Sequence, residues 1–142
     1  MSKRTDARRR RGFSLMELLL VLVILGVLAA LVVPKFANRS QQARETAAKS
    51  GVSSIETALG AFEIDNGRYP STEEGLEALI SAPAGLESWR GPYLNRGMPK
   101  DPWGNDYVYR YPGQLSGGDF DLYSLGPDGR EGNDDIGNWN ED

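Results

Sequence analysis

The chain has 142 residues, about the length of one domain, and a formal net charge of −4. It contains neither cysteine nor histidine, which excludes disulfide bonds, thiolate nucleophiles, Cys/His zinc sites and Ser-His or Cys-His catalytic pairs. These exclusions favour a protein that is not an enzyme.

The charge is unevenly distributed. Residues 1–12 carry six Lys or Arg against Asp6 alone, a net charge of +5, so the chain from Phe13 onward carries −9. A basic N-terminal segment is therefore followed by an acidic body of roughly 100 residues, which is long enough for a modest hydrophobic core.

Between these two parts lies an uncharged apolar run, residues 18–33. Extended to residues 13–36, it gives about 36 Å of helix, enough to cross a hydrocarbon core of about 30 Å. The alternative, a buried helix of a soluble protein, is disfavoured because the remaining chain is too short to wrap it. The six basic residues before this segment outnumber the four that follow within the next 16 positions. The sequence therefore predicts a single membrane span with a cytoplasmic N-terminus.

A removable secretory signal, cut near Ala29 and Ala30, is the alternative interpretation of the same segment. Glu17 argues against it, because a carboxylate among apolar residues of a membrane helix needs a counter-charge. Cleavage after Gly12 would create that charge as an α-amine on Phe13, one helical turn from Glu17 in the same chain or in a neighbouring one.

The segment 10–17, Arg-Arg-Gly-Phe-Ser-Leu-Met-Glu, resembles the leader of type IV pilins and type II secretion pseudopilins. The resemblance implies that a prepilin peptidase cuts after Gly12 and that the new N-terminus, Phe13, is methylated. It also implies that Glu17 guides the docking of subunits.

Apolar residues at helical spacing continue beyond the span and predict one long helix from Phe13 to about Asp65. Pro34 is expected to bend or loosen it. The residues that form this stripe are Ala48, Val52, Ile55, Leu59 and Phe62. Ser71 and Glu74 match a capping box ahead of a second, short helix with an apolar face.

The composition then changes to Gly, Pro and aromatic residues, which favours strands and turns. Residues 106–111 and 119–124 are predicted to form antiparallel strands joined through Gly117 and Gly118. The segment 101–105, Asp-Pro-Trp-Gly-Asn, is typical of a turn.

Three further segments resemble those that mark the major pseudopilins of the type II secretion system, the protein G family: residues 67–70, 101–104 and 121–129. The resemblance implies an α+β, type IV pilin-like fold, with a long N-terminal helix packed on a short helix and a small antiparallel sheet. It divides the chain into a leader (1–12), a transmembrane and filament-core helix (13–36) and a periplasmic globular domain (37–142).

The last 24 residues have a net charge of −7. A solvated acidic tail is one interpretation of this pattern. The other is a Ca²⁺ site, because interleaved glycines allow carboxylate and carbonyl oxygens to converge and oxygen donors suit Ca²⁺. Ile136 and Trp139 would hold the end of such a loop against the body.

The pseudopilin resemblance favours the calcium site, since the family folds its C-terminal loop around one Ca²⁺. The ligands it implies are the side chains of Asp128, Asp134 and Asp135 and the carbonyl groups of Leu125 and Arg130.

Together with these features, the resemblance implies a major pseudopilin that polymerises into a helical filament and drives folded proteins across the outer membrane. Its expected partners are copies of itself, minor pseudopilins, the prepilin peptidase, the inner-membrane secretion platform and, before assembly, the lipid bilayer. No nucleic-acid partner is expected. The alternatives are a type IV pilin, a minor pseudopilin, or a membrane-anchored calcium-binding module that never polymerises.

Overall fold

The computed structural model describes residues 12–139, with the backbone alone for residues 33–37. The chain divides into two compact units, Met1–Ser40 and Gln41–Asp142. In chain order the elements are α1 (Leu15–Asn66), the single 3₁₀ turn η1 (Leu76–Leu79), and the strands β1 (Val108–Arg110), β2 (Asp121–Ser124) and β3 (Ile136–Gly137).

Helix α1 begins where its sequence supplies a cap. The Oγ atom of Ser14 accepts the backbone N–H of Glu17 at 3.2 Å, and the Ser14 carbonyl accepts the N–H of Leu18. The helix assignment continues through Pro34 to Asn66, so the predicted long helix is confirmed to within two residues at its start. The apolar stretch Leu15–Val32 is long enough to span a membrane, and none of it is buried.

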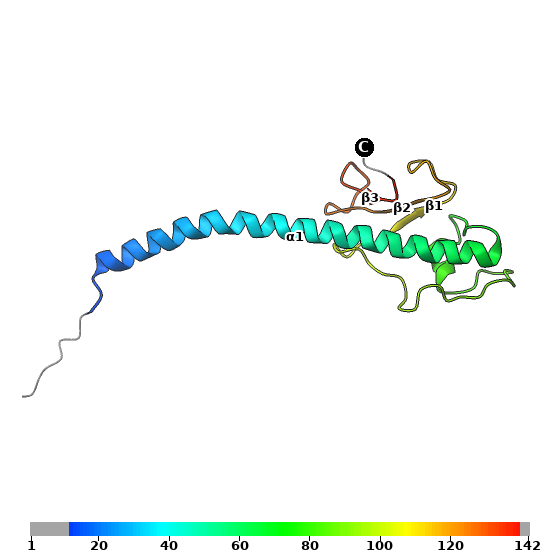
Figure 1. The fold of residues 1–142 in the computed structure, drawn as a ribbon, viewed down its shortest axis with the longest axis horizontal. Coiled ribbons are helices and arrows are strands. Elements are labelled where there is room, and N and C mark those ends of the chain that lie inside the picture. The colour runs from blue at the N-terminus through cyan, green and yellow to red at the C-terminus, as the bar shows by residue number, and fades with distance from the viewer. Residues whose placement is uncertain (1–11, 140–142) are drawn as a thin grey trace, which may run out of the picture. The chain divides into compact units, whose positions relative to one another are not determined.

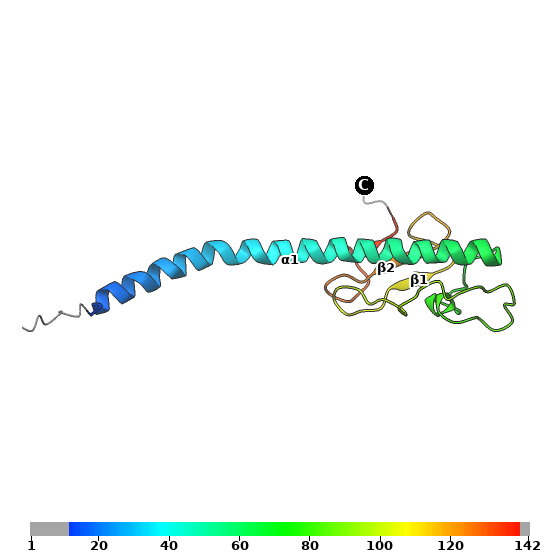
Figure 2. The same cartoon turned by 60° about the horizontal axis from the view of Figure 1, so that its bottom comes forward.

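In the second unit, α1 buries one face against the rest of the domain. The three strands run beside the C-terminal part of α1 (Figures 1 and 2). The buried helix residues are the predicted stripe Ala48, Val52, Ile55, Leu59 and Phe62, joined by Ala58. They share one hydrophobic core with residues of η1, β1 and β2, among them Leu79, Tyr109 and Leu122.

The sheet is antiparallel in the order β1-β2-β3. In the first pair Tyr109 lies opposite Leu122, and in the second Ser124 lies opposite Ile136. All four residues of β2 are buried, because it is the central strand. The predicted strands are confirmed as β1 and β2, whereas β3 was not predicted.

The segment before η1 differs in detail from the sequence expectation. Ser71 and Glu74 do make the reciprocal bonds of a capping box: the N–H of Glu74 reaches Ser71 Oγ at 3.1 Å, and the N–H of Ser71 reaches Glu74 Oε2 at 2.8 Å. These bonds close a turn ahead of Gly75, and only four residues of 3₁₀ helix follow. Arg68 also binds the Glu74 carboxylate with both terminal nitrogens, at 2.6 and 2.7 Å.

Candidate functional site

The first candidate site surrounds the start of α1. Gly12 and Phe13 precede the helix, and Phe13 is 78% exposed. Glu17 is the acidic residue of the first helical turn. It lines a shallow, mostly apolar hollow together with Ser14, Met16, Leu19, Leu20 and Val23. The arrangement places one carboxylate among apolar side chains, as the sequence predicted. The rest of the predicted leader, residues 1–11, lies outside the described residues.

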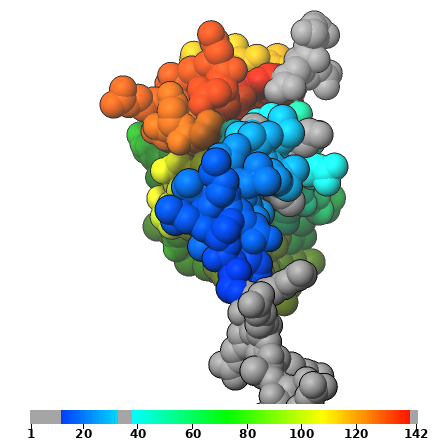
Figure 3. Space-filling model, turned by 90° about the vertical axis from the view of Figure 1, so that its left-hand side faces the viewer, coloured from blue at the N-terminus to red at the C-terminus, as the bar shows by residue number. Residues whose placement is uncertain are grey.

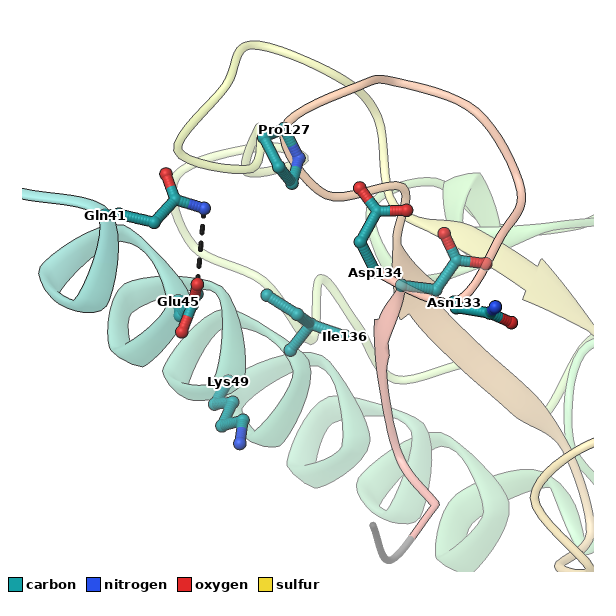
Figure 4. A pocket seen from close by; sticks show the side chains of 8 residues that line it. Gln41, Glu45, Lys49, Pro127, Asn133, Asp134 and Ile136 are labelled. Carbon is teal, nitrogen blue, oxygen red and sulfur yellow. Dashed lines mark hydrogen bonds between the residues drawn. The ribbon is translucent and has the colours of Figure 1, made fainter. Parts of the chain in front are cut away.

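The second candidate site is the C-terminal loop, which we define as residues 125–135, between β2 and β3. Its residues reach the surface of the second unit (Figure 3, orange to red). Figure 4 shows the Asp134 carboxylate within the arc of this loop. The loop forms one side of a cavity of about 220 Å³, and Gln41, Glu45 and Lys49 of α1 form the other.

A tight contact sets the path of the loop at Gly126. Its φ of +66° is accessible mainly to glycine, and a Cβ atom there would lie 2.5 Å from the backbone oxygen of Asp134. The beginning and end of the loop are therefore packed directly against each other, with the Asp134 carboxylate beside Gly126.

The donor chemistry of the loop fits a hard cation. Oδ1 of Asp135 is buried without a hydrogen-bond partner, while its Oδ2 accepts the N–H of Gly132 at 3.1 Å. Burial raises the pKa of Asp135, and the charges of Asp134, Glu131 and Asp128 raise it further. A buried orphan oxygen surrounded by like charges is the environment that a bound divalent ion would relieve.

The remaining predicted ligands lie in the same loop. Asp128 accepts the backbone N–H of Arg130 at 2.8 Å, which makes a local turn. Leu125 directly follows the last residue of β2. Over residues 12–139, no three acidic side chains form a ready metal-binding group. The structure thus buries one oxygen of Asp135 and places the Asp134 carboxylate within the arc of the loop, and it does not gather all three predicted carboxylates.

Contacts with the sheet hold the loop in place. Ile136 is buried in β3, and the ring of Trp139 lies 5.4 Å from that of Tyr123, as the sequence analysis expected of these two anchors. Glu131 accepts a hydrogen bond from the Tyr123 hydroxyl at 3.0 Å and forms an ion pair with Arg110. The Glu131 carboxylate is therefore engaged by the sheet.

Sequence reasoning missed Asn138, which fastens the chain after β3. Its Oδ1 accepts the N–H of Leu122, and its Nδ2 donates to the carbonyl of Phe120. It also missed Asp101 and Ser124, both buried and joined by a hydrogen bond of 2.6 Å. The Asp-Pro-Trp-Gly-Asn pattern around Asp101 was recognised as a turn, but nothing local reveals its partner 23 residues away.

Comparison with known proteins identifies the family of the chain and the motif at its N-terminus. The family described as "Type II secretion system (T2SS), protein G" matches residues 35–139, and the prokaryotic N-terminal methylation motif matches residues 7–33. The chain belongs to the protein G family of type II secretion systems. This match favours a major pseudopilin over the type IV pilin and minor pseudopilin alternatives.

Relatives named type II secretion system core protein G support the assignment. The Pseudomonas aeruginosa protein is 50% identical over 139 residues, covering 93% of this chain and 96% of its own length. The Vibrio cholerae protein is 44% identical over 140 residues, with 94% of each chain covered. The crystal structure of the major pseudopilin of enterohaemorrhagic Escherichia coli superposes with a TM-score of 0.65 at 41% identity, covering 72% of this chain and 87% of that one.

The function of this protein G family member is that of the major pseudopilin in type II secretion, a structural subunit. The comparisons confirm the predicted pilin-like fold, and the N-terminal motif agrees with an apolar helix that anchors the chain in a membrane.

Proposed function

We propose that the chain is inserted with its N-terminus in the cytoplasm, cut between Gly12 and Phe13, methylated at Phe13 and then polymerised, with residues 37–142 in the periplasm. The observation that carries this proposal is Glu17: a carboxylate on an exposed apolar helix whose start lies beside a non-helical Gly12–Phe13 segment. The methylation motif over residues 7–33 supports the same processing.

Glu17 needs a counter-charge that this part of the chain lacks. No Lys or Arg occurs between Gly12 and Pro34. A free carboxylate in the membrane interior costs about 2.5–3.5 kcal/mol on insertion scales. The α-amine of Phe13, released by cleavage, supplies a positive charge one helical turn away. In a filament, the Phe13 amine of one subunit pairs with Glu17 of the next.

The exposed apolar surface of Leu15–Val32 supplies the contact surface for polymerisation. In the bilayer, lipid covers this surface; in the pseudopilus, neighbouring copies cover it. A head-to-tail contact that does not close on itself produces an open helix, so one subunit type suffices. The prepilin peptidase, minor pseudopilins and the inner-membrane secretion platform are the partners of these steps.

Replacement of Glu17 tests the assembly step. We expect Glu17→Gln to insert normally yet yield at least about tenfold less filament, because removing one partner of a buried charge pair costs about 3–5 kcal/mol. Filament is measured by shearing from cells that overproduce the subunit. Glu73→Gln, at an exposed residue of the second unit, is the control and is expected to assemble normally.

Mass spectrometry of the membrane-extracted chain tests the processing step separately. The expected mature mass begins at Phe13 with one added methyl group. A mature chain that begins after Ala30, or one that retains Met1 and its basic segment, would refute the proposed cleavage. Normal filament formation by Glu17→Gln would refute the assembly role.

We further propose that the C-terminal loop binds one Ca²⁺ through the side chains of Asp128, Asp134 and Asp135 and the carbonyl groups of Leu125 and Arg130. Bound calcium would neutralise the converging charges and satisfy the orphan Asp135 oxygen. Because the five donors come from the beginning, middle and end of the loop, binding stabilises the folded loop over the open one.

Metal removal tests this proposal. An ion present at 100 times its Kd stabilises the folded state by about 2.7 kcal/mol, so EGTA is expected to lower the melting temperature and added Ca²⁺ to restore it. The melting temperature of Asp134→Asn should equal that of the EGTA-treated protein and should not rise when Ca²⁺ is added. Asp119→Asn, at an exposed acid outside the loop, should keep the full response. An unchanged melt in EGTA would refute the calcium site.

A further inference from the structure

A buried hydrogen-bonded chain joins the turn 101–105 to the start of the C-terminal loop. Asp101 is 4% exposed and Ser124 is fully buried. The hydroxyl of Ser124 donates to Asp101 Oδ2 at 2.6 Å, and Ser124 Oγ accepts the backbone N–H of Gly126 at 3.2 Å. Neither processing nor filament assembly uses these groups.

The direction of each bond in this chain is fixed by its chemistry. A serine hydroxyl has one proton, and the short contact to a carboxylate commits that proton to Asp101. The lone pairs of Ser124 Oγ are then left to accept the N–H of Gly126. The carboxylate is itself held by its turn, because Asp101 Oδ1 accepts the N–H groups of Trp103 at 3.0 Å and Asn105 at 2.7 Å.

Holding the N–H of Gly126 also holds the carbonyl of Leu125, since both belong to one planar peptide group. Donation from that N–H into a chain that ends on a carboxylate polarises the peptide and increases the negative charge on the carbonyl oxygen. Ser124 therefore acts on the orientation and the donor strength of a carbonyl group that is a proposed calcium ligand.

The turn touches the loop at further points. Gly126 packs against the backbone oxygen of Asp134, so the fixed peptide also supports the opposite end of the loop. A Cβ atom at Gly129 would lie 3.5 Å from the side chain of Asn105, which brings the middle of the loop beside the same turn.

We propose that Asp101 and Ser124 are positioning residues of the calcium loop: they hold the Leu125–Gly126 peptide so that the Leu125 carbonyl can coordinate the ion. This inference rests on the proposed calcium site. It also gives a role to the Asp-Pro-Trp-Gly-Asn turn, which membrane insertion and polymerisation leave without one.

Isothermal titration calorimetry of the full chain in detergent, with Ca²⁺ as the titrant, tests this inference. Ser124→Ala is expected to weaken Ca²⁺ binding by about 10- to 100-fold, the usual effect of removing a group that orients a metal ligand. Asp101→Asn is expected to weaken it as well. The double variant should be no weaker than the weaker-binding single variant, because both residues act through one chain of bonds, whereas independent structural effects would add.

Asp121→Asn is the matched control. Asp121 is also a fully buried carboxylate that organises a loop, through bonds from the N–H groups of Gln114, Leu115 and Ser116. Its loss should destabilise the fold yet change the Kd for Ca²⁺ by no more than about twofold.

The outcomes separate the two proposals. If the unsubstituted chain binds Ca²⁺ and Ser124→Ala binds it equally well, the positioning role is wrong and the calcium site stands. If Asp121→Asn weakens Ca²⁺ binding as much as Ser124→Ala does, the loss of affinity comes from general destabilisation, and the positioning role is also wrong. If the unsubstituted chain does not bind Ca²⁺, both proposals fail. Asp101→Asn keeps the test valid should Ser124→Ala not fold.

Discussion

The two halves of helix α1 carry apolar residues for different purposes. In Leu15–Val32 almost every side chain is apolar and none is buried by the chain itself. In the second half one apolar stripe is buried by the domain, and residues such as Ile55, Leu59 and Phe62 in it are completely buried. One helix therefore contains a surface that only other molecules can cover and a surface that its own domain covers.

This difference shows how the subunit separates folding from assembly. An all-round apolar helix that the chain leaves unburied adds nothing to a hydrophobic core, whereas a stripe at helical spacing is a core-forming face. In the proposed assembly, the second unit can then be stable before and after the first half changes its surroundings from lipid to neighbouring subunits. Two pairs of substitutions and one further substitution, at Glu74, probe this separation.

The largest expected effect follows from truncating one leucine in each half. Leu59→Ala opens a cavity in the core and is expected to cost about 2–5 kcal/mol of unfolding free energy. Leu25→Ala, at a residue that is 56% exposed, is expected to leave the unfolding free energy within about 0.5 kcal/mol. Urea unfolding in nonionic detergent, followed by tryptophan fluorescence, measures both, since all three tryptophans lie in the second unit. Equal losses for the two variants would show that the halves are coupled.

A smaller effect, of opposite sign at two sites, is expected from the helical glycines. A Cβ atom at Gly51 would lie 2.0 Å from the hydroxyl oxygen of Tyr107, so Gly51→Ala forces this side chain out of its packing and should cost about 1–3 kcal/mol. At Gly60 nothing lies within 4 Å of such an atom. Gly60→Ala should instead stabilise the domain by about 0.5–1 kcal/mol through helix propensity.

The same denaturation assay measures this pair. If both Gly51→Ala and Gly60→Ala lose stability, the second half of α1 tolerates no added methyl group. If both gain stability, Tyr107 does not lie against Gly51. The expected opposite signs would show that the domain approaches the helix closely along one face only.

Local signals in the sequence were sufficient for α1. The apolar stripe at helical spacing is read within a few residues, and the observed helix, Leu15–Asn66, ends within one residue of the predicted Asp65. The same kind of signal predicted η1, but its length depended on Gly75, whose φ of 60° ends the preceding turn. Element type was thus predictable and element length less so.

Long-range contacts account for what the sequence did not predict. Strand β3 has two residues, too few for any periodicity, and it forms because Asn138 binds the backbone on both sides of Asp121 in β2. The acidic residues of the loop were visible as a pattern. Their geometry was not, because it depends on contacts between residues that are not adjacent in the sequence, such as the packing of Gly126 against Asp134.

The smallest expected effect concerns the ion pair beside η1. Arg68 holds the pKa of Glu74 at about 2, against an ordinary value of 4.5. A lowered pKa means that the folded state binds fewer protons, so this contribution is fully present above about pH 4.5 and is lost as the pH falls towards 2. Because the Arg68 side chain is 41% exposed, solvent screening limits the contribution to about 1 kcal/mol.

Glu74→Gln keeps an oxygen for the N–H of Ser71 and removes only the charge. At pH 7 in EGTA, which removes any contribution from calcium, the variant should be less stable by about 1 kcal/mol, and at pH 3 the difference should shrink to roughly half or less. If the difference in unfolding free energy between the two proteins is the same at pH 7 and pH 3, the loss of stability comes from packing and not from the charge. Glu74 lies in the second unit and Leu25 in the first. We therefore expect the acid-dependent step to persist unchanged in Leu25→Ala.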